Sequence, residues 1–116
     1  MSAHIKKQLR TAAVIATDTT TNSSGHLLHT HAQELVAISK VTARTDGTFT
    51  TTIQHSPDNA TWYTLAAGSA QSANGDVVIT VASTVSVFQW VRASVLSAST
   101  TTGATVAVEL WHGVQR

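Results

Sequence analysis

Apolar and polar residues alternate along most of the chain after residue 30, which is the pattern of β-strands with one buried face. The same region is rich in the β-branched and aromatic residues that favour strands. Neither helical heptads nor an alternation of strands with helices occurs. The pattern predicts strands at residues 33–44, 48–56, 61–66, 76–82, 86–97 and 104–112.

Turn-forming residues separate the predicted strands. The pair Asp46-Gly47 tolerates positive φ at both positions, so it predicts a two-residue hairpin between residues 33–44 and 48–56. The sequence SPDN at residues 56–59 predicts a turn in which proline presets φ and the Asp and Asn side chains cap the backbone. Strands at this spacing indicate an all-β fold, a single antiparallel β-sandwich or jelly-roll-like domain.

The first 32 residues are less regular. Apolar residues between positions 5 and 16 recur at helical spacing, which allows a short N-terminal helix. The preferred alternative is an extended N-terminal arm that runs into a strand at about residues 11–17, because short isolated helices are marginal. We therefore expect a basic arm leading into the first strand (1–17), a polar mobile loop with a histidine cluster (18–32) and the β-sandwich core (33–116), all in one domain.

The composition narrows the class of protein. A chain of 116 residues has room for one domain, and its 42% of hydrophobic residues suffice for a folded core. Charged residues make up only 11%, against about 25% in a typical soluble domain. A surface of hydroxyl groups and small side chains tolerates close neighbours, which fits a protein that packs against copies of itself or a larger assembly, and also fits a secreted module.

Several classes of partner and location are not expected. The net charge of +1 and the scattered basic residues do not form the basic stripe that nucleic-acid binding requires. The chain has no cysteine, and it lacks both the apolar run of a signal peptide and a stretch of about 20 apolar residues that could span a membrane. We therefore expect synthesis and folding in the cytoplasm, with neither nucleic acid nor membrane as a partner.

One cluster contains residues that bind metals. His26, His29 and His31 lie in the sequence HLLHTH, and an extended backbone would project His29 and His31 from the same face. Two imidazoles can hold Zn or Ni, but a closed site needs about four ligands. The missing ligands would have to come from His4, Asp18, His55 or a symmetry-related chain. We expect solvated histidines, and hence no metal and no cofactor.

No arrangement of residues points to catalysis. The six acidic residues are spread along the chain, no serine lies in a Gly-x-Ser-x-Gly elbow, and no glycine-rich loop could hold a phosphate. The chain is therefore not expected to be an enzyme. A Zn-dependent enzyme that uses the three histidines is a distant third hypothesis.

Two groups of residues are candidates for binding. Trp62 and Tyr63 directly follow a turn and could form an aromatic platform for a sugar ring, although Trp62 in the core is the preferred interpretation. Lys6, Lys7 and Arg10 form the only local concentration of basic residues near the start of the chain. They are either a solvated tail or part of an arm that binds a neighbouring, more acidic subunit.

Two segments combine strands and turns in a recurrent way. Residues 53–65, IQHSPDNATWYTL, contain a strand, a Ser-Pro-Asp turn, an aromatic residue and a short strand. In residues 90–110, WVRASVLSASTTTGATVAVEL, an arginine-bearing strand turns through Ser, Thr and Gly. The first segment resembles a motif of small β-sandwich proteins of phage particles, and the second resembles their terminal hairpin. The two segments cover about a third of the chain, and no functional residue is carried over from the resemblance.

The resemblance implies a virion structural protein, above all a capsid decoration or cement protein. Such a protein binds the major capsid protein or other virion subunits and stabilises the shell on the capsid surface. It would act as a symmetric homo-oligomer, with a trimer preferred. The alternative function is a carbohydrate-binding β-sandwich module, associated with a tail or with attachment, that uses Trp62 and Tyr63.

Overall fold

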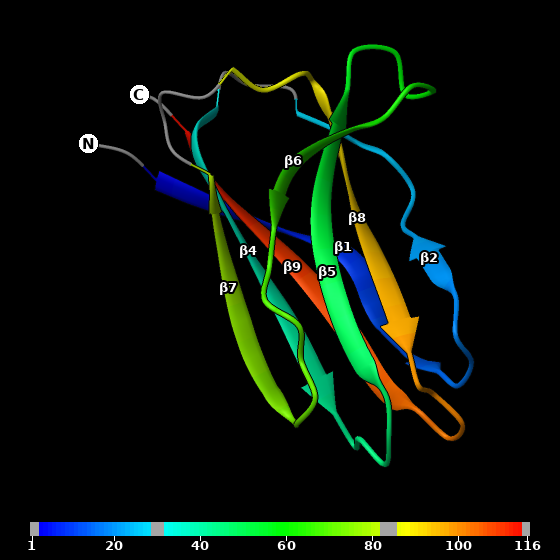
Figure 1. Cartoon of the computed structure of the whole chain (residues 1–116). Helices are drawn as coiled ribbons and strands as arrows, with labels where there is room; N and C mark the ends of the chain where they lie inside the picture. Colours follow the sequence, from blue (N-terminus) through cyan, green and yellow to red (C-terminus); the bar gives the residue numbers. More distant parts are fainter. Residues whose placement is uncertain (1–2, 29–31, 82–85, 115–116) are drawn as a thin grey trace.

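The computed structural model of the protein describes residues 3–28, 32–81 and 86–114. Within these ranges the chain forms β-strands and no helix, which confirms the all-β prediction (Figure 1). The strands are β1 (Ala3–Ile15), β2 (Thr20–Asn22), β3 (His26–Leu27), β4 (Ala32–Thr42), β5 (Thr48–Ser56), β6 (Tyr63–Ala67), β7 (Gly75–Val81), β8 (Trp90–Ala98) and β9 (Ala104–Val114).

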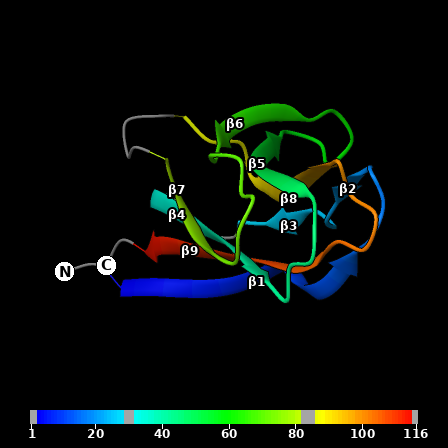
Figure 2. The same ribbon diagram turned by 60° about the horizontal axis from the view of Figure 1, so that its bottom comes forward.

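The strands form two antiparallel sheets that pack face to face as a β-sandwich (Figure 2). The first sheet, sheet A, has the order β1-β9-β4-β7, and the second, sheet B, has the order β2-β8-β5-β6. The short strand β3 also pairs with β8. Each sheet buries one face against the other, because residues along a strand point alternately inward and outward.

The core between the sheets is built from aliphatic side chains. The large side chains that are fully buried include Leu35 and Leu110 in sheet A and Ile53 and Phe49 in sheet B. Phe49 is the single aromatic residue of this core; the five others are half-buried or exposed. Trp62 is half-buried and does not belong to this core, so the interpretation that it packs there is wrong.

A buried polar network links the two sheets. Ser39 of β4 donates a hydrogen bond to Gln71 Oε1 (2.8 Å), and its hydroxyl also lies 2.7 Å from the hydroxyl of Thr51 in β5. Since the single hydroxyl proton of Ser39 is directed to Gln71, Thr51 is the donor to Ser39. The Gln71 amide nitrogen donates to the carbonyl oxygens of Ser39 (3.3 Å) and Gly75 (3.1 Å). All three side chains are buried, so the network fixes one alignment of sheet A on sheet B.

The N-terminal segment is extended, as preferred from the sequence, but it is a full strand rather than a separate arm. β1 begins at Ala3, not at about residue 11, and pairs antiparallel with β9 along its length. Two register shifts, between Gln8 and Arg10 and between Arg10 and Ala13, break the alternation of its side chains. Of the apolar residues at helical spacing, Leu9 is buried whereas Ala12 and Ala13 are exposed, so this spacing does not mark a buried face.

The segment expected to be a polar loop contains two short strands. β2 and β3 both pair with β8. Between and beside them, the backbone N–H of Ser23 donates to Ala93 O (2.8 Å) and that of Leu28 to Gln89 O (2.7 Å). This segment therefore forms the edge of sheet B next to β8. The sequence does not predict these strands, because they are too short and too polar to show an alternation of apolar residues.

The two-residue hairpin expected at Asp46-Gly47 is wrong, because β4 belongs to sheet A and β5 to sheet B. The connection spans residues 43–47 and has positive φ at Ala43 and Gly47 but not at Asp46. The Asp46 carboxylate instead accepts hydrogen bonds from the backbone N–H groups of residues 101–103, in the adjacent β8–β9 loop. A side-chain cap between two loops thus replaces the expected tight turn.

The segment 90–110 that resembles a terminal hairpin also crosses between the sheets, since β8 lies in sheet B and β9 in sheet A. The crossing loop passes very close to the end of β1: a Cβ atom added at Gly103 (φ +87°) would lie 1.7 Å from the carbonyl oxygen of Ile15. By contrast, β5 and β6 do form a hairpin, and Asp58 caps its turn by accepting hydrogen bonds from the N–H groups of Ala60 and Thr61. The turn expected at residues 56–59 is confirmed.

Candidate interaction surfaces

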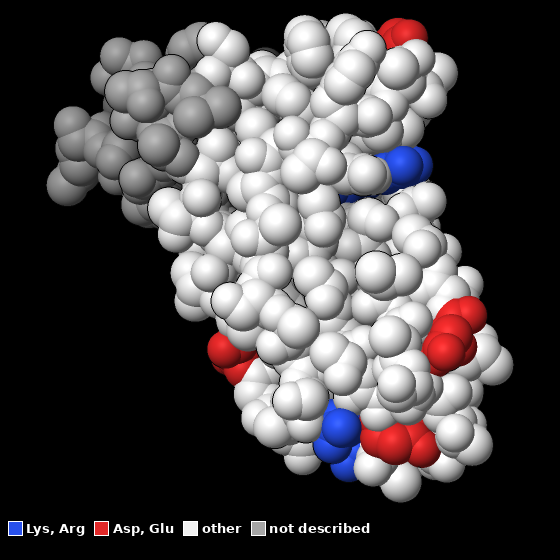
Figure 3. Space-filling view, in the orientation of Figure 1, with Lys and Arg blue, Asp and Glu red and all other residues white. Residues whose placement is uncertain are grey.

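The outer surface of the sandwich carries little charge. Figure 3 shows a face that is free of charged side chains over its middle, with Lys, Arg, Asp and Glu only toward its margins. Any partner of this face would be recognised by shape, hydroxyl groups and apolar contact rather than by a strong field.

The outer face of sheet A carries an apolar patch, here called the Trp111 face, that consists of Val36, Ile38, Val78 and Trp111. The register aligns them across neighbouring strands: Val36 lies opposite Trp111 on β9, and Ile38 lies opposite Val78 on β7. They point away from the core because they alternate with buried residues on each strand. Val78 has 60% of its surface exposed, and the other three are half-buried.

Glu109, Lys6 and Lys40 on the same face are paired with one another, while Asp76 lies exposed at the start of β7. Glu109, which is only 8% exposed, lies 3.3 Å from Lys6 Nζ and 3.2 Å from Lys40 Nζ. The Trp111 indole N–H donates to Glu109 Oε2 (3.3 Å). Burial raises the pKa of Glu109, but the hydrogen bonds from Trp111, Lys40 and Lys6 outweigh burial and lower it. The carboxylate thus stays ionised and compensated, so that the face is apolar without an unpaired buried charge.

The three basic residues of the N-terminal segment do not form one patch. Lys6 lies on the outer face, where its Nζ is 5.8 Å from the centre of the Trp111 ring, while Lys7 is exposed and projects from the opposite side of β1. Arg10 spans the bulge: its Nε donates to Val106 O (3.0 Å) and its guanidinium also donates to Ala13 O (3.4 Å). Lys6 and Arg10 therefore already have partners within the chain.

A second candidate surface lies where β5 ends and β6 begins. His55, Tyr63 and Phe88 form a cluster, here called the aromatic end, with ring centres 4.8 Å apart for His55–Phe88 and 6.2 Å for Tyr63–Phe88. Tyr63 is 51% exposed and Phe88 43% exposed. Burial lowers the pKa of His55, so its imidazole is neutral at pH 7, and its Nδ1 accepts a hydrogen bond from the Phe88 N–H (3.1 Å).

Trp62 and Tyr63 do not form a common platform. Trp62 packs against Arg92, whose guanidinium carbon lies 4.4 Å from the ring centre and whose Nε donates to Gln54 (2.7 Å). Tyr63 instead contacts Phe88. Adjacent residues of an extended chain point to opposite sides, which is why the pair separates. Sequence reasoning missed Phe88 and His55, because nothing in the spacing shows that residues 33 positions apart meet.

The histidine cluster is only partly visible. His26 lies in β3 opposite Val91, whereas His29 and His31 lie outside the described residues. Within the described ranges, no group of three or more His, Cys, Asp or Glu residues could hold a metal ion. The metal-site hypothesis and its Zn-dependent variant gain no support from the geometry.

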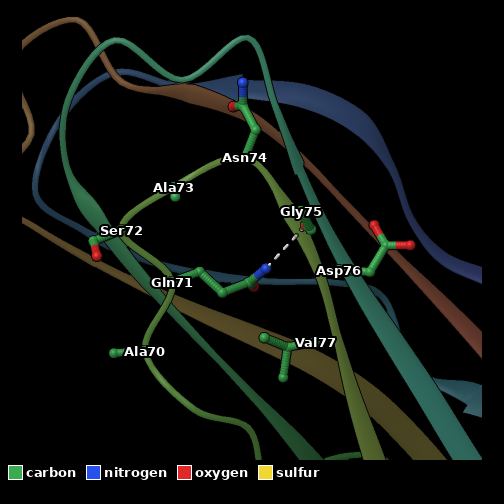
Figure 4. Close-up of a pocket in the computed structure, with 8 residues that line it drawn as sticks. All are labelled: Ala70, Gln71, Ser72, Ala73, Asn74, Gly75, Asp76 and Val77. Atoms are coloured by element: carbon green, nitrogen blue, oxygen red, sulfur yellow. Dashed lines mark hydrogen bonds between the residues drawn. The ribbon is translucent and has the colours of Figure 1, made fainter.

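A shallow hollow of about 290 Å³ lies beside the loop before β7, lined by residues 70–77 (Figure 4). Two of its polar side chains hold the loop: Gln71 donates to Gly75 O, and the Asn74 side chain accepts from the Arg44 N–H (2.9 Å). The hollow contains no nucleophile next to a base, so it offers no catalytic arrangement.

Neither a search for membrane-spanning helices nor comparison with known proteins points to a family or a function. Among the described residues, no helix is long and apolar enough to cross a membrane. The surfaces described above are therefore the basis for a function. Comparison with known proteins found no matching family model, no matching curated protein and no matching solved structure.

Proposed function

We propose that this chain is a structural protein of a phage particle, a capsid decoration or cement protein that binds the major capsid protein or neighbouring virion subunits through the Trp111 face. The observation that carries the proposal is an apolar patch of four side chains across three hydrogen-bonded strands, beside which the buried carboxylate Glu109 is already neutralised by Lys6 and Lys40. Tryptophan is enriched among the residues that dominate binding energy in protein interfaces. In this proposal the chain is made in the host cytoplasm and acts on the capsid surface.

The arrangement of this face suits a permanent interface. Its side chains project from three hydrogen-bonded strands, so binding orders little that is not already ordered. A standard interface buries about 800 Å² per partner. The residues of sheet A around the patch would therefore also contact the partner. Because the chain would bind the assembled shell and not the separate capsid subunits, its binding would shift the equilibrium toward the assembled shell.

The proposal does not use the N-terminal segment as a separate clamp. Because β1 is a strand of sheet A, deleting residues 1–10 would remove most of a strand and expose the edge of β9. If such a deletion variant failed to bind, loss of binding could not be distinguished from loss of folding. Substitutions of outward-pointing side chains are the better test.

The experiment compares binding to capsids assembled without this chain. Trp111→Ala is expected to weaken binding at least about 30-fold, the effect of losing a residue worth about 2 kcal/mol at an interface. Trp62→Ala, which removes a half-buried tryptophan away from sheet A, is the matched control and should bind as the unaltered protein does. Equal binding by both variants and the unaltered chain would refute the proposal, as would absence of the chain from purified particles analysed by mass spectrometry.

A second candidate function, a carbohydrate-binding module, is supported by the exposed rings of the aromatic end. Tyr63 with Phe88 replaces the pair Trp62 and Tyr63 as the surface on which a sugar ring would stack. On a glycan array, Tyr63→Ala should lose binding while Tyr63→Phe, which keeps the ring, should retain most of it. An array without signal for the unaltered chain would eliminate this candidate.

A further inference from the structure

Each open sheet has two edge strands, whose outward N–H and C=O groups can pair with another strand. Sheet A is bordered by β1 and β7, and sheet B by β6 on one side and by β2 and β3 on the other. Natural proteins protect such edges with charged residues, proline, bulges or very short strands, since an unprotected edge recruits other chains.

Most of these edges carry such protection. β1 has three basic residues and two register shifts. β6 has five residues, with a register shift in its pairing with β5. β2 and β3 have three and two residues. These edges are poor templates for further pairing.

The edge formed by β7 carries almost none of these features. Its seven residues, GDVVITV, pair with β4 in an unbroken register and contain no basic residue and no proline. Its only charged residue is Asp76, near its start, and five β-branched residues follow. Figure 1 shows β7 at the margin of the molecule, and no described strand pairs with its outer edge. A Cβ atom added at Gly75 would contact nothing within 4 Å, so the start of the strand is open as well.

We propose that β7 pairs antiparallel with β7 of a second copy of this chain, about a two-fold axis at Val78. Val78 is the middle residue of the strand, so this register pairs all seven residues. It places Val78 opposite Val78, Asp76 opposite Thr80 and Val77 opposite Ile79, so outward residues meet outward ones and the two carboxylates stay apart. A register centred on Asp76 would bring the carboxylates together and leave most of the strand unpaired.

The pairing joins two four-stranded sheets A into one continuous sheet. Main-chain hydrogen bonds supply the affinity, and the exposed Val78 side chains of the two copies meet at the axis. The two-fold axis is perpendicular to the sheet, so both Trp111 faces look in the same direction. The inference goes beyond the proposed function and does not depend on it, and it favours a dimer in place of the trimer preferred from the sequence.

The absence of cysteine from the chain allows a direct test with the full-length protein. In Val78→Cys the two new thiols would face each other at the axis, where opposing Cα atoms of an antiparallel pair are about 4.5–5.5 Å apart, within reach of a disulfide. Mild oxidation should then give a covalent dimer in high yield. Leu96→Cys is the matched control, because Leu96 is apolar, lies on the outer face of sheet B and is similarly exposed (53%, against 60% for Val78). It should cross-link at least about ten-fold more slowly.

A second measurement removes the pairing instead of trapping it. By light scattering, the unaltered chain and Leu96→Lys should have the mass of a dimer, while Val78→Lys, which places two ammonium groups at the axis, should be a monomer with an unchanged far-UV circular dichroism spectrum. Val78 is exposed, so this change leaves the core intact. A monomeric or trimeric unaltered chain, a dimeric Val78→Lys, or equal cross-linking of the two cysteine variants would overturn the inference. None of these measurements involves a capsid, so they are independent of the outcome for shell binding.

Discussion

Replacing Ser39 by alanine removes two hydrogen bonds from the centre of the sandwich at once. The Thr51 hydroxyl loses its acceptor and Gln71 Oε1 loses its donor, while the Gln71 amide nitrogen keeps both of its carbonyl partners. Each buried polar group left without a partner costs about 1–3 kcal/mol. We therefore expect Ser39→Ala to lower the free energy of unfolding by about 3 kcal/mol.

Thr51→Val removes the donor instead and preserves the shape of the side chain. Ser39 still donates to Gln71, so this single change should cost only about 1 kcal/mol. In the double variant the unpaired Thr51 hydroxyl no longer exists, and the expected loss is about 2 kcal/mol rather than the sum of about 4 kcal/mol. The double variant should thus be more stable than Ser39→Ala alone, by about 1 kcal/mol.

The assay is urea unfolding followed by far-UV circular dichroism. With a slope of about 2 kcal/mol per M of urea, Ser39→Ala should lower the midpoint by about 1.5 M and the double variant by about 1 M. Thr50→Val, an outward-pointing change on the same strand, should alter stability by less than about 0.5 kcal/mol. Additive losses, or a double variant less stable than Ser39→Ala, would show that the three side chains do not act as a network.

Three further predictions concern the loops and the first strand. Gly103→Ala should prevent folding or lower the melting temperature sharply, because its Cβ would collide with the backbone of Ile15. Gly75→Ala is the control: this residue is also at positive φ but has open space around it, so the same thermal melt should show a loss of only about 1–2 kcal/mol in the free energy of unfolding. Hydrogen bonds from the backbone N–H groups of Gly103 and its neighbours lower the pKa of Asp46. The ionised carboxylate therefore stabilises the fold above its ordinary pKa, and this stability is lost as the pH falls through the lowered pKa. Melting temperatures measured from pH 7 to pH 2 should show the loss, and Asp46→Asn should make the melting temperature less dependent on pH. Arg10→Met should destabilise the protein by about 1–3 kcal/mol in urea because carbonyl oxygens at the bulge lose their donor, while Lys7→Met should have almost no effect, and equal effects would contradict the assigned role of Arg10.

The fold class and the main strands follow from the sequence, because alternation records which side of a strand faces the core. The pairing of the strands does not follow. Asp46-Gly47 is the sequence of a tight hairpin, yet the chain crosses there from sheet A to sheet B, and the carboxylate caps a loop more than 50 residues away in sequence. Local propensity describes the turn, but only the packing of both sheets determines which strand lies next to which.

The candidate surfaces were accessible to sequence reasoning only in part. The sequence indicates an aromatic platform of Trp62 and Tyr63, whereas in the structure the exposed Tyr63 has Phe88 rather than Trp62 as its neighbour. The basic residues near the start were visible as charges, whereas the pairing of Lys6 with Glu109 depends on the register of β1 with β9. Bulges set this register, and a one-letter pattern does not reveal them.

The location of the tryptophans has a practical consequence for spectroscopy. Trp62, Trp90 and Trp111 are all half-buried and lie outside the aliphatic core. Their intrinsic fluorescence is therefore a poor reporter of unfolding, since the indoles already sense water in the native state. It is a good reporter of contact, because a partner that covers sheet A would shift the emission of Trp111 toward the blue while leaving Trp62 unchanged. Single-tryptophan variants would let the protein reveal, without any label, which of its surfaces is occupied.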